Sequence, residues 1–161
     1  MSTKAAVDRR LSQFGVDLAL AFAGPSGYFE GGDLVSAVSP ARTPRARDLA
    51  LVAGVSAAEQ MLINRIKTQR GELTPLGHPE YGSRHHELIG MPNVQRTRNL
   101  IKVYVLEALS HEPRVARVLS CNVYAPGNKS RSEVRIDMVL ALIDQPTPLN
   151  LVVPFSLAVV T

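Results

Sequence analysis

Residues 97–115 read TRNLIKVYVLEALSHEPRV, and the spacing of their apolar side chains decides the fold. From Thr97 to Leu109 apolar residues recur every three or four positions, which places them on one face of a helix, with the charged residues on the others. Pro113 ends this pattern, because the residue before a proline is pushed out of the helical region. We therefore expect a helix from about residue 93 to 110 and a different element after it.

Beyond Pro113 the apolar period changes to two, as in β-strands. Residues 134–143 show it most clearly, and residues 115–124 form an earlier strand. Gly127-Asn128 lies between them and is a turn signal that favours an antiparallel hairpin. Residues 149–160 would make a third strand, and Pro154 predicts that it lies at an edge, because proline cannot donate to a neighbouring strand.

Two further elements are predicted before the long helix. Ser56 and Glu59 have the spacing of a capping box, so a helix should run from about 57 to 68, with Gly71 ending it. The prolines and glycines of residues 71–90, GELTPLGHPEYGSRHHELIG, predict an irregular loop and then a short helix capped by Ser83.

Residues 1–47 are rich in glycine, proline and serine, which predicts an arm with short extended pieces. Residues 48–161 form the predicted main domain. The dipeptide Asp-Leu recurs at 17–18, 33–34 and 48–49, but three dipeptides are too few to predict a repeat. The expected fold class is α+β: an N-terminal arm, two to three helices, then a small antiparallel sheet of about three strands.

Composition excludes several classes of protein. With 161 residues, 45% of them hydrophobic and 20% charged, the chain is in the range of folded proteins. Its apolar stretches are too short to span a bilayer and it begins without a signal-peptide pattern, so we expect a cytoplasmic start and no membrane insertion. Cys121 is the single cysteine, which rules out an internal disulfide. The net charge of +4 is spread along the chain and there is no tryptophan, so we expect no nucleic-acid partner.

Histidines gather in the loop and short helix, where His78, His85 and His86 lie near Glu80 and Glu87. Imidazole and carboxylate groups can bind metals. However, adjacent histidines point to different sides of a helix, and the HExxH pattern is absent. No metal and no other cofactor is predicted.

Glu72 and Glu80 give the sharpest enzyme hypothesis. Two carboxylates held apart across a cleft could act as acid and base in glycoside cleavage. Against this, any chain of this size has several loop carboxylates, and without tryptophan no aromatic platform for a sugar is visible. The glycines and prolines of the loop also suggest needs of backbone shape.

Glu112, Pro113 and Arg114 place opposite charges on either side of a rigid proline, where the long helix meets the first strand. One interpretation is a surface ion pair worth a few tenths of a kcal/mol. The other is a docking point, at which the planar guanidinium binds a partner's carboxylate or backbone. Residue chemistry alone favours the first.

The order of motifs is more specific than any one of them. DLALVAG is followed by a helix ending RIKT, by GELTPLGHPEYGSRHHELIG, by TRNLIKVYVLEALSHEPRV and by two or three strands. This order resembles the GPW-like baseplate wedge proteins of contractile phage tails, whose fold is shared by a type VI secretion baseplate subunit and by components of extracellular contractile injection particles. The resemblance covers about residues 48–161, and its most specific pieces are GEL with HPEYGS and the EPR triplet.

The resemblance implies a structural protein that initiates sheath assembly. In that role Glu112, Pro113 and Arg114 dock the subunit on the helical bundle of the wedge, and the following strands imitate the sheet of a sheath subunit, so that a strand from the first sheath ring can add to them. The residues expected to pair with the sheath strand are Val134, Ile136, Met138, Leu140, Leu151 and Val153. The residues expected to shape the loop as a scaffold are Gly71, Glu72, Pro79, Tyr81 and Gly82.

The partners implied are other baseplate wedge proteins, the first ring of sheath subunits and tube or hub proteins, with several copies of the chain around the tail axis. The implied location is the baseplate of a virion or injection particle that is assembled in the bacterial cytoplasm. Some members of the family carry a lysozyme-like label, so a peptidoglycan-cleaving enzyme that uses Glu72 and Glu80 stays open as the alternative.

Overall fold

The computed structural model describes residues 14–24, 27–38, 46–127 and 131–159. The chain divides into two compact units, residues 1–61 and 62–161, and each is described by itself. The division falls later than the expected end of the arm at residue 47, because the strands that begin at Arg47 and Leu51 pair with strands of the arm.

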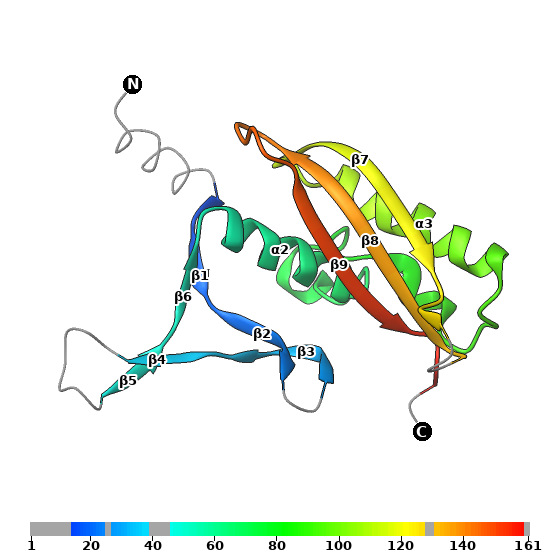
Figure 1. Cartoon of the computed structure of the whole chain (residues 1–161), viewed down its shortest axis with the longest axis horizontal. Coiled ribbons are helices and arrows are strands. Elements are labelled where there is room, and N and C mark those ends of the chain that lie inside the picture. Colours follow the sequence, from blue (N-terminus) through cyan, green and yellow to red (C-terminus); the bar gives the residue numbers. More distant parts are fainter. Residues whose placement is uncertain (1–13, 25–26, 39–45, 128–130, 160–161) are drawn as a thin grey trace. The chain divides into compact units, whose positions relative to one another are not determined.

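The second unit contains the expected antiparallel sheet. Its strands are β7 (Val115–Tyr124), β8 (Glu133–Leu142) and β9 (Leu149–Ser156), in the order β7-β8-β9. The predicted hairpin of β7 and β8 is confirmed, and so is the edge position of the strand that contains Pro154. Figure 1 shows these strands crossing in front of the long helix.

The helices lie close to the predicted ranges. They are α2 (Val55–Lys67) and α3 (Gln95–Ser110), with short 3-10 helices at η1 (Thr74–Leu76) and η2 (Arg84–Leu88). The predicted capping box is wrong, because α2 already begins at Val55 and Ser56 lies inside its first turn. Gly54 turns the chain into the helix with a φ of 62°, and its carbonyl accepts the first helical hydrogen bond, from Ala58 at 3.0 Å.

Ser83 is the N-cap residue of η2, as predicted, but its hydroxyl does not cap the helix. The hydroxyl lies 2.8 Å from Nδ1 of His85 and donates to the carbonyl of Tyr104 at 3.4 Å. Because both partners lie inside the unit, Ser83 ties η2 to α3 instead of stabilising a helix end.

The core of the second unit lies between one face of the sheet and the helices. Every second side chain of β8 is buried, as the predicted alternation requires. α3 contributes the buried residues Ile101, Val105 and Leu109 and packs against β7. Removing such side chains from water stabilises the fold by about 1.5–3 kcal/mol each.

The described part of the first unit consists of short strands that pair two by two (Figure 1) and of the first half of α2. The three antiparallel ribbons are β1 (Val16–Leu18) with β6 (Leu51–Ala53), β2 (Leu20–Gly24) with β3 (Gly27–Leu34), and β4 (Ser36–Val38) with β5 (Arg47–Leu49). The extended pieces expected in the arm are therefore present, and each has a partner strand.

The ribbons meet at a ring of three backbone hydrogen bonds. Ala19 N–H donates to Ala50 O at 2.8 Å, Ala50 N–H to Val35 O at 2.7 Å, and Val35 N–H to Ala19 O at 3.0 Å. Each of these residues directly follows one of the Asp-Leu dipeptides. In each dipeptide the aspartate Oδ1 accepts a hydrogen bond from the leucine N–H. The recurring dipeptide is thus a structural repeat with approximate threefold symmetry.

Gln60, on the first half of α2, holds one corner of this junction. Its Oε1 accepts a hydrogen bond from Leu20 N–H at 2.7 Å, and its Nε2 donates to Leu18 O at 2.8 Å. The buried amide therefore satisfies two backbone groups that a neighbouring strand would otherwise satisfy.

In the second unit, Gly82 brings the end of the loop against the chain that leaves α2. Ser83 N–H donates to Thr68 O at 2.9 Å, and Arg70 N–H donates to Ser83 O at 3.2 Å. Gly82 has a φ of 103°, and a Cβ there would lie 2.6 Å from Thr68 O. Only glycine allows this approach, because both neighbouring surfaces are backbone.

We expect Gly82→Ala to lower the free energy of unfolding by at least about 2 kcal/mol more than Gly77→Ala does. Gly77 is the matched control, because its φ is also positive, at 84°, but a Cβ there meets nothing within 4 Å. Urea unfolding of both variants measures the difference. Equal losses would mean that the close approach at Gly82 is not what holds the loop.

Candidate functional site

The candidate site is built around the turn that joins α3 to β7. Glu112 lies in this turn, and only 5% of it is exposed. Its backbone N–H donates to Leu109 O at 3.1 Å, and its carbonyl accepts from Val115 N–H at 3.0 Å. These bonds aim the carboxylate inward, where Nη2 of Arg65, on α2, donates to Oε2 at 3.0 Å.

Arg114 lies on the outer side of the same carboxylate. Its backbone N–H donates to Glu112 Oε1 at 3.3 Å, and its Nε lies 3.8 Å from that oxygen. The Arg114 side chain is 39% exposed. Within the EPR triplet, Glu112 is therefore buried and Arg114 lies at the surface of the unit. The interpretation as an exposed ion pair does not describe Glu112.

Arg65 is the part of this site that the sequence did not reveal. Its guanidinium lies over the ring of Tyr81, 4.5 Å from the ring centre, and its Nε has no hydrogen-bond partner in the part of the chain that the structure describes. Burial raises the pKa of the Tyr81 hydroxyl, and the Arg65 charge partly opposes that shift. Tyr81 thus packs the loop onto the ion pair.

A shallow pocket of about 340 Å³ opens beside this cluster. It is lined by the loop from Gly77 to Tyr81, including Pro79, and by Arg65 and His111. Gly71, at the start of the loop, has a φ of 89°, in the region that favours glycine. Of the loop residues named as a scaffold, Pro79 and Tyr81 line this pocket, and Tyr81 also packs against Arg65.

The two carboxylates of the enzyme hypothesis lie in exposed, paired positions. Glu80 is 65% exposed and forms an ion pair with Arg70, which also binds Glu107 at 2.6 Å. Glu72 is exposed and accepts a hydrogen bond from Gln69 N–H at 3.2 Å. The catalytic acid of a glycosidase lies in buried surroundings that raise its pKa, so that the carboxyl group keeps its proton. Neither residue has such surroundings.

The expected sheath-pairing residues lie in the core. Val134, Ile136, Met138 and Leu140 belong to β8, which is the central strand and pairs with β7 and β9. These four residues are expected to pair with a sheath strand, but in this sheet both edges of β8 are occupied, by β7 and by β9. Leu151 and Val153 lie on β9, an edge strand, but their side chains are buried.

The edges left open by the sheet are those of β7 and β9. β7 has register shifts between Val115 and Arg117 and between Val118 and Ser120, and β9 contains Pro154. Bulges and prolines hinder uncontrolled pairing at an edge. The regular parts of these two strands therefore form the open edges of the sheet.

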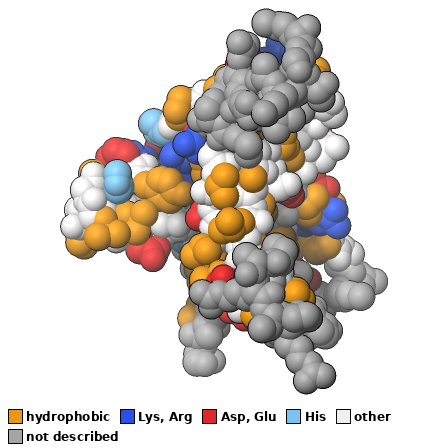
Figure 2. Space-filling model, turned by 90° about the vertical axis from the view of Figure 1, so that its left-hand side faces the viewer, with side chains coloured by type: hydrophobic (Ala, Val, Ile, Leu, Met, Phe, Trp, Pro, Cys, Tyr) orange, Lys and Arg blue, Asp and Glu red, His pale blue; other side chains and the backbone are white. Residues whose placement is uncertain are grey.

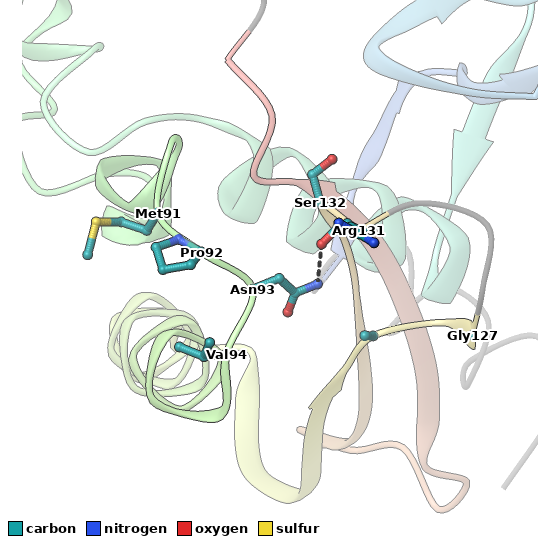
Figure 3. Close-up of a pocket in the computed structure, with 8 residues that line it drawn as sticks. Met91, Pro92, Asn93, Val94, Gly127, Arg131 and Ser132 are labelled. Carbon is teal, nitrogen blue, oxygen red and sulfur yellow. Dashed lines mark hydrogen bonds between the residues drawn. The ribbon is translucent and has the colours of Figure 1, made fainter.

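A second pocket, of about 760 Å³, lies where the loop before α3 faces the start of β8 (Figure 3). Asn93 crosses between the two segments, because its side-chain amide donates to Arg131 O at 3.2 Å and to Glu133 O at 2.9 Å. Met91 and Val94 are about half exposed at its rim. No sequence motif marked this pocket.

The histidines differ in how deeply their side chains are buried. His85 is buried against Phe155, with 4.4 Å between the ring centres, whereas His78 is exposed. His86 lies 3.2 Å from Ile66 O through its Nε2. Among the described residues no group of three His, Cys, Asp or Glu side chains could hold a metal ion. Burial, with a smaller contribution from the neighbouring His86, lowers the pKa of His85 to about 3.

No protein-family model matches this sequence, and no curated protein matches it. Among solved structures, a protein of Geobacter sulfurreducens that is provisionally named a tail lysozyme is similar, with a TM-score of 0.50 and 28% sequence identity. The likeness covers 62% of this chain and 90% of that one. The α+β fold is therefore similar, over this part of the chain, to that of a protein provisionally named for a tail. Within the described part of the chain no helix is long and apolar enough to cross a membrane.

We expect Glu112→Ala to lower the free energy of unfolding by about 3–5 kcal/mol, because it leaves the Arg65 charge buried without its carboxylate. Arg114→Ala removes only the outer, partly exposed partner and should cost less than about 1 kcal/mol. Denaturant unfolding of both variants measures this. Similar losses would contradict the division of the triplet into an inner and an outer charge.

We expect acid to destabilise the protein through His85. The pKa of about 3 in the folded chain lies below the ordinary value of 6.5, so the unfolded chain binds more protons between these values. The free energy of unfolding should therefore fall with decreasing pH, by up to about 1.4 kcal/mol per unit from this residue. His85→Gln should show a shallower slope in urea unfolding at several pH values, and an unchanged slope would contradict the burial of a neutral imidazole.

Proposed function

We propose that this protein is a structural, non-enzymatic baseplate component of a contractile tail or injection machine. It docks on the helical bundle of the wedge and initiates sheath assembly by strand addition. The observation that carries the proposal is the EPR turn, in which a buried carboxylate positions a partly exposed arginine at the base of a sheet with two open edges. The likeness to a protein named for a tail supports the same class.

The geometry of the turn supports docking through Arg114. The Glu112 carboxylate accepts from the Arg114 backbone and lies near its Nε, so the backbone and the start of the side chain are held before a partner binds. A guanidinium positioned in this way can make paired hydrogen bonds to a carboxylate or to carbonyl groups. Holding the group in advance reduces the ordering cost of binding.

Strand addition would take place at β7 or β9. Both strands have one edge without a partner in the sheet, and an edge offers N–H and C=O groups to an incoming strand. Val152, on β9, and Leu119, on β7, are also more than a third exposed and could be covered by a sheath subunit. The proposed partners are other wedge proteins, the first sheath ring and tube or hub proteins, in several copies around the tail axis of a virion or injection particle.

The alternative, a peptidoglycan-cleaving enzyme, has less support, because Glu80 is paired with Arg70 and Glu72 is exposed. The two functions separate in a simple assay. An enzyme would clear a suspension of cell walls and lose that activity on Glu72→Gln, whereas the assembly protein would leave the suspension turbid.

We expect Arg114→Glu to prevent sheathed particles from forming, because it reverses the exposed charge and leaves the Arg65–Glu112 pair in place. Electron microscopy of particles from cells that produce the variant measures this, and a soluble variant with sheaths absent or detached from baseplates is the expected result. Arg96→Glu is the matched control, because it makes the same charge change at an exposed position on α3. Normal sheathed particles with Arg114→Glu would show that this arginine does not dock the subunit.

A further inference from the structure

The junction of three ribbons in the first unit has two chemically different faces. Side chains alternate between the faces of a strand, and directly paired residues share a face. Leu18 pairs with Leu51, Leu49 with Ser36, and Leu34 with Leu20. At the ring, a single residue joins each strand to the next one along the chain. The residues on either side of it are two positions apart, so their side chains point to the same face. The six positions therefore lie on the same side of the junction. The large exposed side chains on this side, which we name the Leu face, are Val16, Leu18, Leu34, Val38, Leu49 and Leu51.

The acidic residues of the repeat lie on the other side. Asp17, Asp33 and Asp48 each precede a leucine of the Leu face, so their side chains point to the opposite face. The Gln60 amide reaches Asp17 Oδ2 at 3.5 Å. The carboxylates and the contact from α2 to Asp17 are therefore on the side away from the leucines.

The Leu face is unusually apolar for a surface that meets water. Its six residues are between 39% and 69% exposed. Figure 2 shows hydrophobic side chains (orange) at the surface of the face that it draws. Arg47, which shares this face, is turned to its neighbour Ser36, where the guanidinium donates to the carbonyl at 3.0 Å and to the hydroxyl at 2.8 Å. Contiguous apolar patches of this kind mark contact sites.

The geometry favours a second copy of the same chain as the occupant. From the exposed fractions, one Leu face offers roughly 600 Å² of apolar surface, so two faces together would bury about 1,200 Å², the lower bound for a specific interface. Two flat sheet faces can pack together at about 10 Å. The Leu face has approximate threefold symmetry. When two copies are related by a two-fold axis that lies in the plane of this face, each of the three ribbons of one copy packs against a ribbon of the other.

The positions of the carboxylates agree with this arrangement, and Arg47, which shares the Leu face, is bound to Ser36 of its own chain. Stacking Leu face on Leu face leaves the aspartates of both copies on the outer surfaces, so no like-charged carboxylates are brought together. Stacking through the opposite faces would bring Asp17, Asp33 and Asp48 of one copy toward those of the other. The isolated two-stranded ribbons also need cover, because such ribbons are only marginally stable in water.

We propose that the first unit self-associates face to face through the Leu face, forming a dimer of this chain. The inference rests on the ribbons alone and does not depend on the proposed role in a baseplate. Failure of the docking experiment on Arg114 would leave it unchanged, because Arg114 belongs to the other unit.

The test is sedimentation velocity on the full chain over a range of protein concentrations. An interface of this size should give a dissociation constant of roughly micromolar order, so the unmodified chain should pass from monomer to dimer up to about 100 µM. Leu51→Lys places a charge on the Leu face and should weaken the dimer at least tenfold. Ala37→Lys is the matched control, because Ala37 is exposed and pairs with Asp48 on the opposite face, and it should dimerise as the unmodified chain does.

Circular dichroism checks that each variant is folded, and Val38→Lys, on another ribbon, replaces Leu51→Lys if that variant unfolds. A chain that stays monomeric at all concentrations would overturn the proposal. Equal weakening by Leu51→Lys and Ala37→Lys would also overturn it. A monomer that sediments with phosphatidylcholine vesicles would assign the Leu face to a lipid surface instead.

Discussion

The buried ion pair of Arg65 and Glu112 is the contact on which the rest of the second unit depends. It joins α2 to the turn between α3 and β7, two segments 47 residues apart in the chain. Both charges are removed from water, so each is tolerated only because the other is in place. Tyr81 packs under the guanidinium and Arg114 approaches the carboxylate from outside, so the loop and the surface arginine take their positions from this pair.

The ion pair also explains how one residue triplet can be structural and exposed at once. Pro113 separates the buried carboxylate of Glu112 from the partly exposed side chain of Arg114, and the same Glu112 contacts both Arg65 and Arg114. A substitution of Glu112 would thus alter the core and the surface together. Arg114 is the position at which a docking role can be separated from folding.

The ribbons of the first unit are organised by backbone hydrogen bonds. Its three ribbons have few buried side chains among the described residues, and the ring of Ala19, Val35 and Ala50 takes the place of packing. Small residues at two of the three ring positions let the backbones approach closely. Because few side chains of the ribbons are buried, leucines and valines stay exposed on one surface, the Leu face.

The sequence by itself determined the α+β class, the ranges of α3, β7 and β8, and the edge position of β9, because these depend on local periodicity and on proline chemistry. It did not determine the start of α2, since Gly54 in a left-handed conformation served where the Ser56 capping box was expected. It also placed four of the six expected sheath-pairing residues on β8, because alternation alone did not show that this strand lies between the other two. Only the tertiary structure decided that Arg65 meets Glu112 and that three Asp-Leu dipeptides close a ring, because both arise from contacts between residues far apart in the chain.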